Sequence, residues 1–105
     1  MTNRSKASAP VTLVTEADFQ QTVIDFAKLR AWSVYHTHDS RSSAAGFPDL
    51  VLARPPQLLF VELKTEAGMV SQAQKEWVQV LNSCDKVMAT VWRPRQWDVI
   101  QRILE

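Results

Sequence analysis

The sequence contains little glycine and almost no cysteine, and both shortages exclude classes of site. Its two glycines, Gly46 and Gly68, cannot form a glycine-rich phosphate-binding loop. The single cysteine, Cys84, excludes an intrachain disulfide and is consistent with a reducing compartment. No Cys-His or Ser-His-Asp arrangement has a supporting spacing, so we interpret Cys84 as a core or helix-end residue rather than a nucleophile.

Long apolar stretches are also missing. The longest uninterrupted apolar runs, such as Leu58 to Val61, fall far short of the roughly 20 residues that a membrane-spanning helix needs. The polar N-terminus lacks the apolar segment of a secretion signal. We therefore expect a soluble intracellular protein, in the cytoplasm or associated with the nucleoid, or in the host cytoplasm if the source is a virus.

No charge of one sign dominates, because 12 lysines and arginines accompany 11 acidic residues and give a net charge of +1. This balance does not indicate a nucleic-acid binder. It does not exclude one either, because active-site carboxylates count as negative here although a bound metal ion would offset them.

The length of 105 residues fits one domain with a core of moderate size. Residues 1–12 are small and polar and have no periodicity, so they predict a disordered N-terminal tail. Residues 13–105 then form the single folded domain.

Apolar periodicity predicts three helices. The first follows a capping box at Thr15 and runs to about Arg30, the second follows Ser71 and runs to about Ser83, and the third spans residues 96–104. Strands are predicted at residues 32–38, 49–53, 58–64 and 86–92. The last strand is almost continuously apolar, so it is expected inside the sheet. This pattern predicts an α/β protein in which helices cover both faces of a mixed sheet.

The two central strands are separated by Pro55 and Pro56, which cannot donate to a sheet ladder. Two prolines cannot supply the positive φ of a tight hairpin turn, so we predict a four-residue loop, Arg54 to Gln57. Pairing symmetric about the proline bond places Asp49 opposite Glu62. Side chains alternate along a strand, so Lys64 shares their face. The opposite face is wholly apolar and consists of Leu50, Leu52, Leu59, Val61 and Leu63.

Two like carboxylates at a strand end are unfavourable unless something holds them. The candidates are a shared proton, the ammonium group of Lys64, or a divalent cation. Oxygen ligands of this kind suit Mg²⁺ or Mn²⁺.

The order of these residues resembles the PD-(D/E)xK nuclease pattern, because Pro48-Asp49 precedes an apolar strand that ends in Glu62-Leu63-Lys64. A longer arrangement is similar to the VRR-NUC (virus-type replication-repair nuclease) family and spans nearly all of the chain after the first dozen residues. It adds Gly46 before Pro48, Ser71-x-x-Gln74-x-x-Trp77, and Val91-Trp92-Arg93-Pro94. The resemblance implies a restriction-endonuclease-like core of order α-β-β-β-α-β, followed here by a C-terminal helix.

The resemblance also implies a Mg²⁺- or Mn²⁺-dependent DNA endonuclease. Asp49 and Glu62 would bind the metal with the Leu63 backbone carbonyl, and Lys64 would orient the attacking water or stabilise the transition state. Glu16 is implied as a further acid at the metal site, although an acid in the first turn of a helix also complements the helix dipole. Gln74 has two interpretations as well. It completes a cap with Ser71, or it holds a metal-bound water or a phosphate oxygen.

Candidate DNA contacts surround this site. Arg41 can clamp a phosphate with its planar fork, and a solvated loop arginine is nearly as good an interpretation. Gly46 permits a close approach of the backbone. Gln20 and Ser71 complete the set. His36 and His38 share one strand face, but a zinc site needs three or four ligands, so neither is predicted to bind zinc.

For a stand-alone member, the resemblance implies a structure-selective nuclease that acts on branched DNA, like a Holliday-junction resolvase. A homodimer would match the two symmetric cuts in a four-way junction. Three alternatives stay open: a non-catalytic DNA-binding relative, a nuclease for RNA or linear duplex, and an interaction module in which Asp49, Glu62 and Lys64 form a structural ion-pair network.

Overall fold

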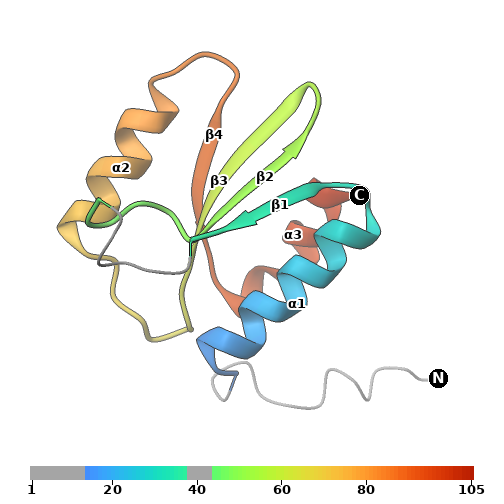
Figure 1. The fold of residues 1–105 in the computed structure, drawn as a ribbon. Helices are drawn as coiled ribbons and strands as arrows, with labels where there is room; N and C mark the ends of the chain where they lie inside the picture. Colours follow the sequence, from blue (N-terminus) through green and yellow to red (C-terminus); the bar gives the residue numbers. More distant parts are fainter. Residues whose placement is uncertain (1–13, 38–43) are drawn as a thin grey trace.

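A computed structural model describes residues 14–37 and 44–105 (Figure 1). The predicted tail, His38 and Arg41 lie outside the described residues, so the predictions for them stay predictions. The elements in chain order are helix α1 (Glu16–Leu29), strands β1 (Ser33–His36), β2 (Leu50–Arg54) and β3 (Gln57–Leu63), helix α2 (Gln72–Asn82), strand β4 (Met88–Trp92), the 3-10 turn η3 (Pro94–Gln96) and helix α3 (Trp97–Leu104). This order confirms the predicted α-β-β-β-α-β core with a C-terminal helix. None of these helices is long and apolar enough to cross a membrane.

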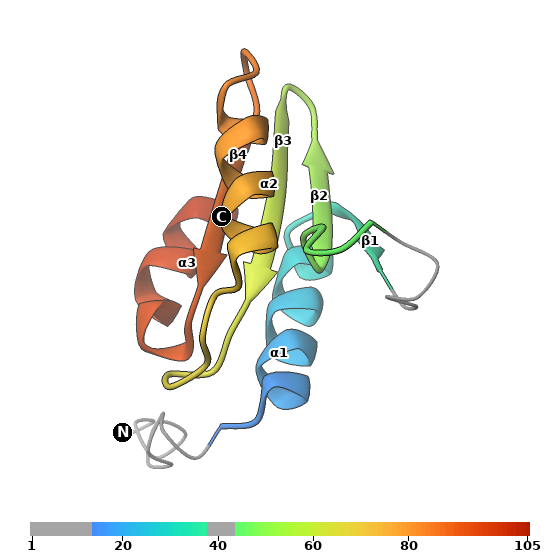
Figure 2. The ribbon, with the colours of Figure 1, turned by 90° about the vertical axis from the view of Figure 1, so that its left-hand side faces the viewer.

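The strands form one mixed sheet in the order β1-β2-β3-β4. The pairs β1–β2 and β2–β3 are antiparallel, and β4 runs parallel to β3. Helices α1 and α3 lie on one face of the sheet and α2 lies on the other (Figure 1, Figure 2). The layered α/β arrangement that the sequence predicted is therefore confirmed.

Strands β2 and β3 pair in the predicted register. Val51 lies opposite Phe60, as pairing symmetric about the Pro55–Pro56 bond requires. The predicted four-residue loop is wrong, because Arg54 and Gln57 also pair across the strands. The Pro55–Pro56 peptide bond is cis, and a turn with a cis proline at its third position reverses the chain without a positive φ.

The main core lies between the sheet and helices α1 and α3. The face of the hairpin that was predicted to be apolar supplies Leu50, Leu52, Leu59, Val61 and Leu63, all of which are buried. Helices α1 and α3 add Phe19, Val23, Ile24, Ala27, Ile100 and Leu104. Because side chains alternate along a strand, Glu62 belongs to the other face, the one covered by α2.

Helix α2 packs less deeply on the sheet than the other helices, and none of its residues is fully buried. Trp77 of α2 packs edge-to-face on Phe47, with ring centroids 5.0 Å apart, and Phe47 packs in the same way on Phe60 at 5.9 Å. Aromatic pairs of this kind contribute roughly 0.5–1.5 kcal/mol beyond their buried area. Phe47 precedes Pro48 and Asp49, so this cluster fixes the start of β2 relative to α2.

Strand β4 lies at an edge of the described sheet, and the prediction that it is internal is wrong. Its apolar character has another cause: Ala89 is buried on the α2 side and Trp92 belongs to the core on the opposite side. The strand also begins at Met88 rather than Lys86, because Lys86 has a φ of 65°. The side-chain amide of Asn82 accepts from the Ala89 N–H and donates to its carbonyl, both at 2.8 Å, and so covers part of the edge.

Candidate active site

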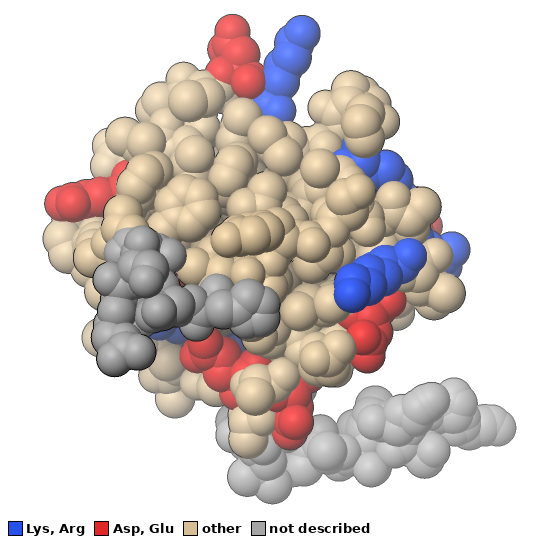
Figure 3. Space-filling view, viewed as in Figure 1, with Lys and Arg blue, Asp and Glu red and all other residues tan. Residues whose placement is uncertain are grey.

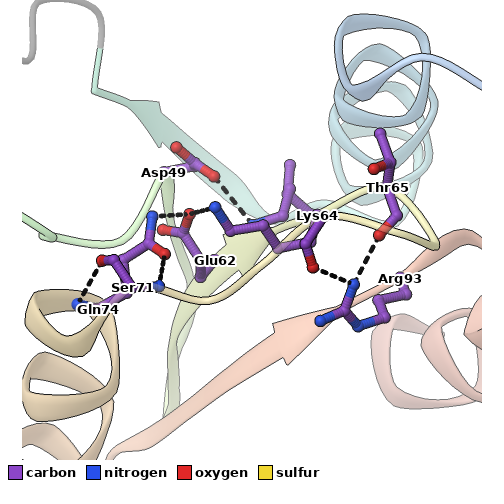
Figure 4. Close-up of polar contacts among 9 residues, drawn as sticks. Asp49, Glu62, Lys64, Thr65, Ser71, Gln74 and Arg93 are labelled. Atoms are coloured by element: carbon purple, nitrogen blue, oxygen red, sulfur yellow. Dashed lines mark hydrogen bonds and ion pairs between the residues drawn. The ribbon is translucent and has the colours of Figure 1, made fainter.

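The carboxylates of Asp49 and Glu62 meet where β2 begins and β3 ends (Figure 4). Asp49 is held at both its backbone and its side chain. Its carbonyl accepts from the Thr37 N–H at 2.9 Å, and its Oδ2 accepts from the Leu63 N–H at 2.9 Å. The hairpin register therefore brings the two acids to one place, as the sequence predicted.

Glu62 is almost completely buried, with 3% of its surface exposed. Its Oε2 accepts a 2.7 Å hydrogen bond from Gln74 Nε2 and lies 3.8 Å from Lys64 Nζ. Its Oε1 is buried and has no hydrogen-bond donor among the described residues. The amide of Gln74 and the ammonium group of Lys64 therefore both lie at Oε2, and Oε1 faces no donor group among the described residues.

The pKa of Glu62 is raised from 4.5 to about 8: burial is the largest cause, the charge of Asp49 adds to the rise, and Lys64 acts in the opposite direction. A hydrogen bond between the two carboxyl groups adds to this rise, but it requires a proton on one of them, because ionised carboxylates only accept. With both groups ionised the pair repels. The site therefore favours either a bound proton or a bound cation.

Gln74 serves the helix cap and the carboxylate together. Its Oε1 accepts from the Ser71 N–H at 2.8 Å, while Ser71 Oγ accepts from the Gln74 N–H at 3.1 Å, which completes the predicted capping box. Its Nε2 points the other way, to Glu62. The cap interpretation of Gln74 is confirmed. Its Nε2 binds Glu62 here, so a contact of Gln74 with a metal-bound water or a phosphate oxygen stays a prediction.

Gly46 makes its close approach to α2. It has a φ of +81°, and a Cβ at this position would lie 2.5 Å from the Ala73 carbonyl carbon and 2.7 Å from the Gln74 nitrogen. Only glycine tolerates both conditions. Gly46 therefore seats the chain before Asp49 against the turn of α2 that carries Gln74.

Glu16 begins α1, after the Thr15 cap. Partial burial raises its pKa, the charge of Asp49 raises it further, and Lys64 lowers it. The charge of Glu16 also contributes to the raised pKa of Glu62. These mutual effects place Glu16 within electrostatic range of the carboxylate pair.

No three His, Cys, Asp or Glu side chains within residues 14–37 and 44–105 are grouped so that they could hold a metal ion. The described side chains thus bring together two carboxylates, with Glu16 as a neighbouring charge. The pair still fits a divalent cation, because Glu62 Oε1 lacks a donor and Asp49 disfavours the ionised form of Glu62. A cation between the two carboxylates would give Oε1 a partner and would offset the repulsion between Asp49 and Glu62.

The remaining predicted residues differ in position. Ser71 is exposed at the start of α2, and Gln20 is partly buried on α1. His36 ends β1 at the edge of the sheet, and Cys84 is exposed just beyond the end of α2. Ser71 has no function here beyond the cap of α2, and the position of Gln20 assigns it none. Their DNA contacts stay predictions.

Arg93 makes a set of contacts that the amino-acid sequence did not predict. Its Nη1 donates to the backbone carbonyls of Thr65, Glu66 and Gly68, in the loop that joins Lys64 to α2 (Figure 4). Backbone carbonyls are present at every residue, so such contacts leave no pattern of side-chain types. The only signal was Trp92-Arg93-Pro94, as part of the pattern that resembles the VRR-NUC family.

Comparison with known proteins agrees with this geometry. The sequence model of the VRR-NUC domain matches residues 5–94, which include the hairpin and Gln74. Among solved structures, a VRR_NUC domain protein is similar to this chain with a TM-score of 0.66 and 25% sequence identity, over 85% of this chain and 84% of that chain. No curated protein matches the sequence. The match over most of its length shows that the chain belongs to the VRR-NUC family of nuclease domains.

Proposed function

We propose that the protein is a divalent-metal-dependent endonuclease that hydrolyses phosphodiester bonds in DNA. The observation that carries the proposal is the buried carboxylate of Glu62, which has one oxygen held by Gln74 and near Lys64 and the other oxygen without a donor. A structural ion-pair network would be expected to satisfy both oxygens. Asp49 beside it completes a pair of acids that a cation would stabilise.

Asp49 and Glu62, with the Leu63 carbonyl, are the residues that would hold Mg²⁺ or Mn²⁺. Such an ion, when bound, neutralises phosphate charge and makes water a better nucleophile at neutral pH. Gln74 fixes the Glu62 carboxylate by its 2.7 Å bond, so the unpartnered oxygen keeps one orientation. Lys64 brings a positive charge within 3.8 Å of Glu62, where it can stabilise negative charge that builds up on the phosphate.

The substrate we favour is branched DNA, cut by a homodimer. On the face shown in Figure 3, the described residues form no extended basic surface, and most of that surface is neither acidic nor basic. A small module of this kind has little surface for reading base sequence, so recognition of DNA shape is the better fit. RNA and linear duplex remain the alternative substrates, and a non-catalytic DNA binder is the alternative function.

The test is cleavage of labelled four-way junction, flap, linear duplex and RNA during titration with Mg²⁺ or Mn²⁺. Asp49→Asn, Glu62→Gln and Lys64→Ala are each expected to lower the rate by about 100-fold or more. The first two remove negative charge that would hold the cation, and the third removes positive charge that would act on the phosphate. Asp98→Asn, an exposed acid in the first turn of α3, is the matched control and should cleave normally.

Undiminished cleavage by Glu62→Gln would contradict the proposed function. Equal rates on all four substrates would remove the preference for branched DNA. Light scattering that detects only monomer at the working concentration would remove the homodimer.

A further inference from the structure

The loop of residues 65–70 connects two parts of the candidate site. Lys64 lies directly before it, and Ser71 and Gln74 lie directly after it at the start of α2. The loop also folds back along Lys64, since a Cβ added to Gly68 would lie 3.4 Å from Lys64 Cδ. The conformation of this loop therefore sets how the ammonium group and the amide approach Glu62.

Arg93 is the residue that holds this loop from β4. The Lys64 N–H donates to the Trp92 carbonyl at 3.0 Å, so the backbone of Arg93 lies beside the start of the loop. Its Nη1 then donates to the carbonyls of Thr65 at 2.7 Å, Gly68 at 2.8 Å and Glu66 at 3.3 Å. Charged donors to carbonyls form stronger hydrogen bonds than neutral ones.

A second contact fixes the same loop from the turn after β4. The carboxylate of Glu66 accepts from the Arg95 backbone N–H at 2.6 Å and from Arg95 Nε at 2.8 Å. The Arg95 side chain is 71% exposed, whereas that of Glu66 is 9% exposed. Solvent weakens the side-chain contact with Arg95, so Arg93 is the stronger of the two side-chain attachments.

We propose that Arg93 is a positioning residue of the nuclease site, which orders loop 65–70 and thereby holds Lys64 and Gln74 against Glu62. This inference rests on the proposed function. Arg93 acts through the loop and needs no contact with DNA, because its Nη1 is occupied by backbone carbonyls. A lysine at this position keeps the charge but has a shorter side chain and a more strongly hydrated head group, so it should replace arginine only in part.

The first measurement is hydrogen exchange of the protein without metal or DNA, in Arg93→Ala, Arg93→Lys and the control Arg102→Ala. Arg102 is an exposed arginine in the last turn of α3. Arg93→Ala should speed exchange at the Gly68 and Ser71 amides by about tenfold or more, while α1 and β3 stay protected, because the opening is local. The exchange rates of Arg93→Lys should lie between those of the wild type and Arg93→Ala, and the rates of Arg102→Ala should match the wild type. Unchanged exchange in residues 65–71 of both Arg93 variants would overturn the inference.

The second measurement separates positioning from DNA contact. At saturating DNA, Arg93→Ala should lower the single-turnover rate by roughly tenfold or more, because misplaced site groups reduce catalysis while binding is retained. The dissociation constant for DNA and its salt dependence should match those of Arg102→Ala. In a Lys64→Ala background, adding Arg93→Ala should cost much less than it does alone, because the two residues act as a unit.

Weaker DNA binding with a smaller salt slope would identify Arg93 as a phosphate contact and overturn the inference. The inference would also be overturned if the losses in single-turnover rate from Arg93→Ala and Lys64→Ala were fully additive. If the wild type cleaves none of the four substrates, the proposed function fails and the exchange measurement alone decides whether Arg93 orders the loop.

Discussion

Glu62 has an environment that a residue chosen only for stability would not have. Its carboxylate is buried beside Asp49, and its Oε1 receives no hydrogen bond from the described residues. Burying an ionised group without full pairing is costly. That cost is what makes the site suitable for a cation, because the folded protein gains most when the missing charge is supplied.

The raised pKa of Glu62 predicts how the metal-free protein responds to pH. The ordinary pKa of a glutamate carboxyl group, which applies in the unfolded chain, is 4.5, and the pKa of Glu62 in the folded protein is about 8. Between these values the folded state binds more protons than the unfolded state, so the free energy of unfolding should fall as the pH rises from about 4.5 to 8. Urea unfolding in chelator should show this fall in the wild type and a smaller fall in Glu62→Gln. Parallel pH profiles for the two proteins would contradict the prediction.

Gln74→Glu separates the two functions of Gln74. A glutamate oxygen can still accept from the Ser71 N–H, so the cap of α2 should survive. The new carboxylate loses the donor to Glu62 Oε2 and repels it, so the pKa of Glu62 should rise further and cleavage should fall by about 10–100-fold. Carboxyl NMR titration and cleavage rates check the two effects. An unchanged pKa of Glu62 would show that the amide is not what holds the carboxylate.

At the residue scale, the sequence predicts which side chains meet better than it predicts their bonds. Asp49 and Glu62 could be paired in advance because Pro55 and Pro56 fix the register of the hairpin. The division of the Gln74 amide between Ser71 and Glu62 could not be predicted, because it depends on how α2 docks on the sheet. The loop contacts of Arg93 depend on tertiary structure in the same way.

The elements differ in how far their sequence determines them. Both long helices begin at their predicted caps, Thr15 and Ser71, because a cap is a local interaction. The place of β4 at the sheet edge was not predictable from its composition, since a strand covered on both faces is apolar wherever it lies. Its later start follows from the left-handed backbone of Lys86, which no pattern around it indicated.

The docking of α2 on the chain before β2 yields a prediction for Gly46. Gly46→Ala should reduce the free energy of unfolding by about 1–3 kcal/mol, because its φ is +81° and its Cβ would collide with Ala73. Gly68→Ala is the control, because Gly68 has no positive φ and a Cβ added there would come no closer than 3.1 Å to another atom, Thr65 Oγ1. Denaturant titration of both variants checks this. Equal losses would show that the contact with α2 is not what requires glycine at position 46.

At the scale of the whole molecule, the site draws on both layers. The hairpin supplies Asp49 and Glu62, α2 supplies Gln74 from one face, and α1 brings Glu16 from the other side of the sheet. The order of elements and the family resemblance could be predicted from the sequence because they depend on periodicity and spacing. The distances among these groups could not, because they depend on the packing of separate elements.

A cation that binds only the folded site should stabilise the whole protein. Mn²⁺ or Mg²⁺ at ten times its dissociation constant should add about 1.4 kcal/mol, and thus several degrees of melting temperature in a domain of this size. A chelator should reverse the shift. Glu62→Gln should lose the response, and the exposed control Asp98→Asn should keep it. No shift in the wild type at millimolar metal would contradict a preformed metal site.

The side-chain amide of Asn82 also limits how two copies of this chain can associate. It occupies the N–H and the carbonyl of Ala89, the groups through which another strand would join the sheet at that point. A continuous intermolecular sheet through β4 would first have to displace it. A twofold assembly of this protein is therefore expected to use other surfaces and to leave the β4 border of the sheet closed.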